Sequence, residues 1–177
     1  EQMAEIDDLN LKFKINNLKF RILKGSECDI LKDGSLDLPD EVLEKLDIVG
    51  VSIHSFFNLS REEQTARVIK AIKNPHADIL FHPTGRLINK RPAIDLDIEE
   101  IIKVAKEIGT VMEIDAFYDR LDLKDDHIRM CVNAGVKLAI DSDAHSPSHF
   151  SMLEYGVAQA RRGWAERNDV INAWPLE

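Results

Sequence analysis

Three polar side chains at alternate positions, Asp141, Asp143 and His145, follow the apolar run at 136–140. Side chains of an extended chain alternate between its two faces, so these three can point the same way. An apolar run that ends in carboxylates and an imidazole is typical of a buried strand that delivers oxygen and nitrogen ligands to a divalent metal. A strand followed by an acidic turn explains this stretch alone equally well, so the rest of the chain must decide.

The bulk properties of the chain set limits on its class. Its 177 residues, 44% hydrophobic and 31% charged, fit one globular domain with a substantial core. A net charge of -9 argues against non-specific binding to nucleic acid or membranes, although bound cations can reverse the charge locally. No apolar run reaches the about 18 residues of a membrane span. Only Cys28 and Cys131 are present, so no disulfide framework is indicated and we expect a cytoplasmic protein.

The spacing of apolar residues predicts alternating strands and helices. Strands are predicted at 20–31, 47–54, 77–82, 110–115 and 136–141. Helices are predicted at 1–19, where the pattern is amphipathic, and at 39–46, 60–73, 97–109, 124–134 and 146–162, with a short one after Asn168. Such alternation forms βαβ units, so the fold class is α/β with a parallel sheet. In these sheets chemistry collects beyond the carboxyl ends of the strands.

Ionisable side chains lie at or near the ends of these predicted strands: Glu27, His54, His82, Glu113, Asp115, Asp143 and His145. Three of the six histidines in the chain are among them. Carboxylates gathered at one end of a sheet would repel one another unless cations lay between them. The sequence therefore favours a metal site over a set of separate structural histidines.

The remaining histidines call for a simpler interpretation. His76 lies in a connection, and His127 and His149 lie in predicted helices, so all three are interpreted as structural or solvated. Asp29 and Asp141 are intermediate cases, because either could orient a ligand histidine from behind. Their roles stay open at this point.

Four segments, in order along the chain, resemble the later motifs of the PHP family (polymerase and histidinol phosphatase). They are Lys-Gly-Ser-Glu-Cys-Asp-Ile-Leu at 24–31, Ser-Ile-His-Ser at 52–55, Phe-His-Pro-Thr-Gly-Arg at 81–86 and Asp-Ser-Asp-Ala-His at 141–145. With Arg-Leu-Asp-Leu at 120–123, the form resembles the C-terminal PHP domain of bacterial and archaeal family-X DNA polymerases. The resemblance implies a distorted barrel of seven βα units that holds up to three divalent metals (Zn, Mn or Fe). It also implies hydrolysis of phosphate esters, in these polymerases at DNA 3′ ends.

The resemblance further implies roles for five metal ligands. Glu27 would be a bridging carboxylate that forms one metal centre together with His54 and His82. Asp143 would be a ligand of a second centre and His145 a ligand of a third.

The predicted catalytic residues are Arg86 and Asp143. Arg86 would face the substrate phosphate, on which a guanidinium can place two parallel hydrogen bonds. Asp115 departs from the family pattern, in which an asparagine is expected. The roles of Asp115 and of Glu113 stay open.

A larger departure is the absence of the motifs with which the family opens. The chain contains neither the His-x-His motif with its nearby aspartate nor the Thr-Asp-His of the second strand. We expect their strands to precede residue 1, so that residues 1–177 form a single partial PHP domain of about five βα units, without the upstream polymerase domain. Such a partial barrel would leave sheet edges open at 22–30 and 136–140, which predicts self-association.

Together the residues and the resemblance predict the metal-dependent phosphoesterase module of a family-X DNA polymerase. It would act in DNA repair as a 3′–5′ exonuclease or 3′ phosphatase, with DNA as substrate and the polymerase domain as partner in cis. We expect this chain to be at best feebly active, because two of the three metal centres lack ligands. Two alternatives stay open: a barrel hydrolase of small molecules, amidohydrolase-like or histidinol-phosphatase-like, and a non-catalytic module that braces a polymerase.

Overall fold

A five-stranded parallel sheet organises the chain in the computed structural model, which describes residues 1–175. Its strands are β1 (Gly25–Asp29), β2 (Ile48–Ser52), β3 (Ile79–Leu80), β4 (Val111–Asp115) and β5 (Leu138–Asp141). They lie side by side in chain order, and every neighbouring pair is parallel. A doubly wound sheet reverses its strand order at a switch point. The order found here is that of a βα barrel, so the fold is α/β and corresponds to an incomplete barrel, as predicted.

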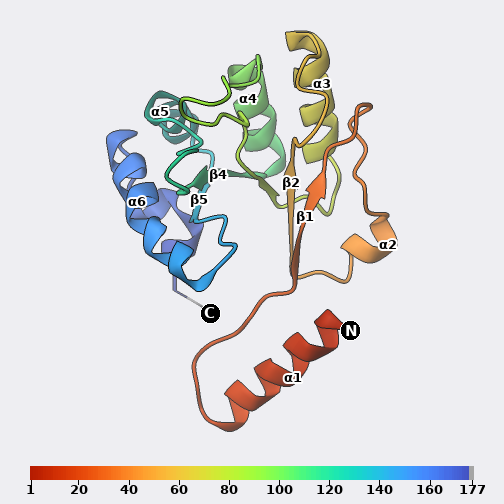
Figure 1. Cartoon of the computed structure of the whole chain (residues 1–177), viewed down its shortest axis with the longest axis vertical. Coiled ribbons are helices and arrows are strands. Elements are labelled where there is room, and N and C mark those ends of the chain that lie inside the picture. The colour runs from red at the N-terminus through yellow and green to blue at the C-terminus, as the bar shows by residue number, and fades with distance from the viewer. Residues whose placement is uncertain (176–177) are drawn as a thin grey trace.

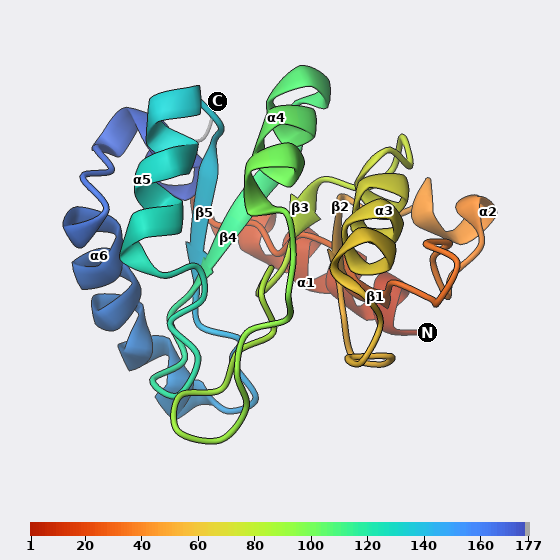
Figure 2. The ribbon, with the colours of Figure 1, turned by 90° about the horizontal axis from the view of Figure 1, so that it is seen from above.

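Four helices connect successive strands and follow one another around the sheet, whereas α1 (Gln2–Ile15) precedes β1 and α6 (Leu153–Arg162) follows β5 (Figures 1 and 2). The four connecting α-helices are α2 (Asp40–Leu43), α3 (Arg61–Ile72), α4 (Ile98–Ile108) and α5 (Asp125–Ala134). Each of α3, α4 and α5 contacts the next helix along the chain. No helix in the described part of the chain combines the length and the apolar character needed to cross a membrane.

Local sequence signals set the boundaries of these helices. α3 begins at the capping box, in which Ser60 and Glu63 each accept a hydrogen bond from the other's backbone N–H. α4 and α5 end at Gly109 and Gly135, whose φ angles of 87° and 74° suit glycine. The predicted helix at 146–162 is divided, because Pro147–Met152 forms a 3₁₀ helix before α6 begins. The short helix predicted after Asn168 does not form in the described residues, which have 3₁₀ turns at Arg167–Asp169 and Ile171–Ala173.

The N-terminal helix differs from its prediction as an amphipathic helix. α1 forms, but none of its side chains is buried, and Met3 and Leu9 remain exposed. Its contacts are local: the Asn10 amide pairs with both backbone groups of Ile22, and Phe13 packs edge-on against a neighbouring phenylalanine. Residues 20–24 form this connection, which is why the first strand begins only at residue 25.

The two outer strands differ in how their edges are covered. At β5, Asn172 accepts a hydrogen bond from the backbone N–H of Ile140 and donates one to its carbonyl, and Val170 forms a parallel bridge with Leu138. The prediction that the edge at 136–140 is open is therefore wrong, because the C-terminal turns fold back over it. At β1, only Asp29 has partners on the outer side in the described part of the chain. The Asp37 carboxylate accepts a hydrogen bond from the Asp29 N–H, and the Asp37 N–H donates one to the Asp29 carbonyl. On the outer side of β1, the backbone of residues 25–27 pairs with no other strand among the described residues.

Candidate metal centre

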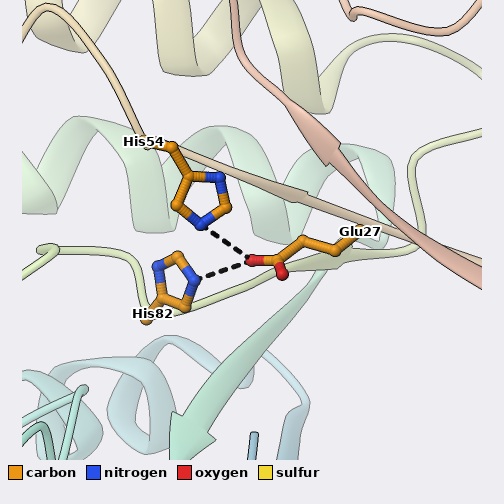
Figure 3. A group of neighbouring side chains, drawn as sticks. All are labelled: Glu27, His54 and His82. Atoms are coloured by element: carbon orange, nitrogen blue, oxygen red, sulfur yellow. Dashed lines mark hydrogen bonds and ion pairs between the residues drawn. The ribbon is translucent and has the colours of Figure 1, made fainter. Parts of the chain in front are cut away.

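Three ionisable side chains from neighbouring strands converge at the carboxyl end of the sheet (Figure 3). Glu27 lies on β1, while His54 and His82 follow β2 and β3. The distance from Glu27 Oε1 to His82 Nε2 is 2.7 Å, and that from Glu27 Oε1 to His54 Nε2 is 3.3 Å. One ligand atom from each residue lies within 4.8 Å of the other two. Because parallel strands end at the same side of the sheet, residues far apart in the chain meet here.

A glycine beside Glu27 makes room for this convergence. Gly50 is the β2 residue paired with Glu27, and a Cβ atom at Gly50 would lie 1.9 Å from the ring of Phe81. Phe81 immediately precedes His82, so the missing side chain lets the ring pack over β2 and brings His82 next to Glu27.

The donor set fits a divalent cation. Two imidazole nitrogens and a carboxylate oxygen are the mixture that Zn²⁺ and related transition metals accept. Asp29 Oδ1 lies 2.6 Å from His54 Nδ1, which donates to it and thereby directs Nε2 toward Glu27. Carboxylates in this position commonly orient metal-binding histidines. Asp29 thus occupies the orienting position considered from the sequence.

His82 is held in place by buried polar contacts. Its side chain is 3% exposed, its φ angle is +26°, and its backbone N–H donates to Glu113 Oε2. Two residues further on, the backbone N–H and the hydroxyl of Thr84 each donate to the buried Asp122 carboxylate at 2.9 Å. A positive φ in a residue with a side chain persists only where its surroundings enforce it. Glu113 and Asp122 supply that constraint on either side of the turn.

The protonation of the three ligands is coupled through their hydrogen bonds. Burial acts to raise the pKa of Glu27, but hydrogen bonds from His54 and His82 outweigh it and hold this pKa below its ordinary value. The hydrogen bond to Glu27, assisted by the one to Asp29, raises the pKa of His54 to about 9. In the absence of a metal, His54 is therefore an imidazolium between two carboxylates, which places a positive charge where the donor set would hold a cation.

Metal affinity is expected to rise with pH up to about 9. A cation binds the neutral imidazole, so below the His54 pKa of about 9 its binding must release a proton. The apparent affinity for Zn²⁺ should fall by up to about tenfold for each pH unit below that value. Titration calorimetry in buffers of different ionisation enthalpy would measure both the affinity and the proton release. An affinity that stays constant from about pH 6.5 to pH 8.5 would contradict the combination of a raised His54 pKa and metal binding by this residue.

A second group of carboxylates lies behind the three ligands. Glu113 and Asp115 are buried on β4, next to Asp141 at the end of β5. Burial raises the pKa of Asp115 to about 8 and raises those of Glu113 and Asp141 above their usual range. Arg120 is the cation in this region, with its Nε 3.2 Å from Asp115 Oδ2 and 3.6 Å from an Asp143 oxygen.

The three other predicted site residues, Asp143, His145 and Arg86, lie at different places relative to the three ligands. Asp143 lines the same hollow as Glu27 and His82, with a volume of about 300 Å³. His145 is 74% exposed and its Nδ1 donates to the Asp143 carbonyl, away from the three ligands. Arg86 donates through Nε and Nη2 to backbone carbonyls at 120 and 121, and it lines a separate hollow. The proposed roles of Asp143, His145 and Arg86 stay predictions.

Three residues of this region received no role from the sequence: Arg120, Asp122 and Phe150. Arg120 and Asp122 belong to a quoted motif, but one partner of each, Asp143 for Arg120 and Thr84 for Asp122, lies far away in the chain, so spacing gave no signal. Phe150 lines the same hollow as Glu27 and His82, with a side chain that is 63% exposed. An exposed aromatic residue next to a polar site is the one signal that could have identified it.

No family model matches this chain, but known proteins are similar to it, one of them over its whole length. The chain is 44% identical over 177 residues to the DNA polymerase/3′-5′ exonuclease PolX of Bacillus subtilis (strain 168), covering 100% of this chain and 30% of that protein. It is 39% identical over 161 residues to a probable phosphatase of Thermoanaerobacter sp. (strain X514), covering 85% of this chain and 63% of the relative. A probable phosphatase of Acetivibrio thermocellus is 36% identical over 133 residues, which are 71% of this chain and 53% of the relative.

The chain spans less than two thirds of the length of each of these relatives. The similarity to PolX nevertheless includes all of its residues, and thus all four motifs and the three converging ligands. The parallel βα topology agrees with the barrel that the motifs imply. The chain is therefore similar over its whole length to part of a PolX DNA polymerase, which is consistent with a fragment of a PHP domain.

Proposed function

We propose that the chain is the phosphoesterase module of a PolX-type DNA polymerase and hydrolyses phosphate esters at DNA 3′ ends with bound divalent cations. The observation that carries the proposal is the convergence of Glu27, His54 and His82 at the carboxyl end of the sheet. The names of the relatives support the proposal. One is named a 3′-5′ exonuclease and others probable phosphatases, and both kinds of enzyme hydrolyse phosphate esters.

In this proposal each residue of the site has a defined task. Glu27 and the Nε2 atoms of His54 and His82 hold a cation, which when bound neutralises phosphate charge and lowers the pKa of a water molecule. Asp29 fixes the His54 ring, as its 2.6 Å contact with Nδ1 indicates. Asp143 faces the same hollow of about 300 Å³, in which a phosphoryl group fits.

Further cations are part of the proposal, up to three in an intact domain, with Zn, Mn or Fe as candidates. Asp143 is proposed as a ligand of a second cation and His145 as a ligand of a third. Arg86 is proposed to contact a phosphate of the substrate with the guanidinium nitrogen, Nη1, that its carbonyl contacts do not use. Only one group of converging metal ligands exists among the described residues, so we expect slow hydrolysis by this chain.

The test is hydrolysis of a 3′-labelled oligonucleotide by this chain at high protein concentration with Mn²⁺. We expect slow, Mn²⁺-dependent release of the 3′ nucleotide or 3′ phosphate that Glu27→Gln abolishes. Glu41→Gln changes the charge equally on the exposed surface of α2 and should leave the rate unchanged. A rate that is independent of the metal, or that survives Glu27→Gln, would refute the proposal.

A small-molecule phosphatase is a second candidate, because relatives named probable phosphatases match over 85% of this chain. Turnover of p-nitrophenyl phosphate without any action on a DNA 3′ end would favour this alternative. A non-catalytic module that braces a polymerase would hydrolyse neither substrate. We place the reaction in the cytoplasm, since Cys28 and Cys131 are both buried and free of disulfides.

The open edge of β1 is expected to let two copies of the chain associate. Residues 25–27 have no strand partner on their outer side among described residues, and an unpaired edge is a template for pairing. Sedimentation should show a dimer at high micromolar concentration. Ser26→Lys places a charge on this edge and should shift the chain toward the monomer. A wild-type monomer that also melts above about 65 °C would contradict this expectation.

A further inference from the structure

A second hollow, of about 540 Å³, lies beyond β3 on the loop that carries His82. Its ionisable lining residues are all basic or imidazole side chains: Arg86, Lys90, Arg91, Lys124 and His127. No carboxylate is among the residues that line it. In a chain with a net charge of -9, such a concentration of positive side chains is unusual and indicates an anionic ligand.

Two of these positive charges have no carboxylate partner among the described ion pairs. Arg91 Nε donates to the Gly85 carbonyl at 2.8 Å, and its guanidinium lies over the Phe57 ring at 4.3 Å from the centroid. Arg86 donates only to backbone carbonyls. Burial, followed by the nearby positive charge of Arg120, lowers the pKa of Arg91. A bound anion would relieve this electrostatic cost.

The other two cations are paired with carboxylates outside the hollow. Lys90 contacts Asp119 at 2.8 Å and Lys124 contacts Asp126 at 2.7 Å. Both pairs are on the surface, where such pairs contribute little and exchange readily. Lys90 and Lys124 can therefore turn toward an incoming anion at small cost.

The position of this hollow connects it to the metal centre. Thr84 lines the hollow, and His82 lies only two residues before it. The loop after β3 packs on the loop after β4, as the contacts Thr84–Asp122 and Lys90–Asp119 show. Figure 2 shows both loops beyond the same end of the sheet. A strand with its scissile ester at the metal ligands could reach this hollow with another of its phosphates.

We propose that the hollow lined by Arg86, Lys90 and Arg91 binds a phosphate group, namely a backbone phosphodiester of the substrate strand away from the scissile bond. Guanidinium groups match the oxygens of a phosphate with paired hydrogen bonds, and lysine adds a mobile charge. This inference rests on the proposed function, because a nucleic-acid substrate is what places several phosphates in one molecule.

The test is an amide NMR titration of the metal-free chain at low ionic strength, with inorganic phosphate and with a short single-stranded oligonucleotide. Both probes should shift the amides of residues 86–91 and 124–127, and the oligonucleotide should bind more tightly. Arg91→Gln should weaken oligonucleotide binding about tenfold and lower the dependence of log affinity on log salt by about 1. Lys90→Gln, at an exposed position, should weaken oligonucleotide binding by a smaller factor.

The control is Lys103→Gln, which makes the same charge change on the exposed side of α4 and should leave the affinity unchanged. Oligonucleotide binding that survives both Arg91→Gln and Lys90→Gln would overturn the inference. Equal affinity for inorganic phosphate and oligonucleotide would overturn the assignment to a nucleic-acid strand. Because the titration needs no metal and no turnover, its failure is distinguishable from failure of the proposed function, which shows in the Glu27→Gln hydrolysis assay.

Discussion

Replacement of His82 by alanine is expected to abolish stoichiometric binding of a divalent cation to this chain. The His82 ring is 3% exposed, and its Nε2 lies 2.7 Å from Glu27 Oε1, so no other side chain can take its place without rearrangement. Loss of residues that merely orient a ligand costs about 10- to 100-fold in metal affinity. Loss of the ligand itself should therefore exceed about 100-fold. Titration calorimetry with Zn²⁺ measures the change in affinity, and the metal content of the dialysed protein gives the stoichiometry.

His76→Ala is the matched control for this substitution. His76 is also partly buried, but it lies in the connection between α3 and β3, outside the group of converging ligands. We expect the His76 variant to bind one equivalent of Zn²⁺ with the affinity of the unsubstituted chain. Stoichiometric binding that survives His82→Ala would exclude this residue as a ligand.

Replacement of Asp122 by alanine should destabilise the chain by about 2–4 kcal/mol, because two buried donors lose their acceptors. Asp122 is 0% exposed, and its carboxylate accepts hydrogen bonds from both the backbone N–H and the hydroxyl of Thr84. The same contacts hold the turn that follows His82, so Zn²⁺ affinity should decrease as well. Urea denaturation gives the change in the free energy of unfolding.

Asp122→Asn separates the hydrogen bonds from the charge. The amide keeps one acceptor for the Thr84 N–H and a donor for its hydroxyl, and burial already raises the pKa of Asp122. We expect this variant to lose less than about 1 kcal/mol. Equal destabilisation by alanine and asparagine would indicate that the ionised carboxylate, and not its hydrogen bonds, holds the turn.

The architecture and the three converging ligands could be predicted because they depend on local patterns. Most of the strands are short apolar runs between helices, although β1 is polar, and parallel pairing brings the strand ends together. These positions placed Glu27, His54 and His82 at or near strand ends, and the resemblance to the PHP motifs joined the three into one metal centre. The capping box at Ser60 and the glycine at 109 likewise act within a few residues, and they set the predicted helix boundaries at 60 and 109.

The features that the sequence did not reveal depend on contacts between distant residues. Asn172 covers the edge of β5 from 32 residues away, and no periodicity predicts which side chain meets an edge. Arg86 was expected at the substrate phosphate, but carbonyls 34 and 35 residues away hold two of its nitrogens. An amphipathic helix was predicted at 1–19, yet no side chain of α1 is buried in the described fold.

The most direct measurement of the metal centre is a crystal structure of this chain with Zn²⁺, using anomalous scattering at the zinc absorption edge. We predict one strong peak about 2.0–2.1 Å from the Nε2 atoms of His54 and His82, and about 2.0–2.2 Å from a Glu27 oxygen. Asp29 should remain hydrogen bonded to His54 Nδ1, as it is without metal. A peak confined to Asp143 or His145, or no peak between Glu27 and the two histidines, would contradict the assignment of these three residues as a metal centre.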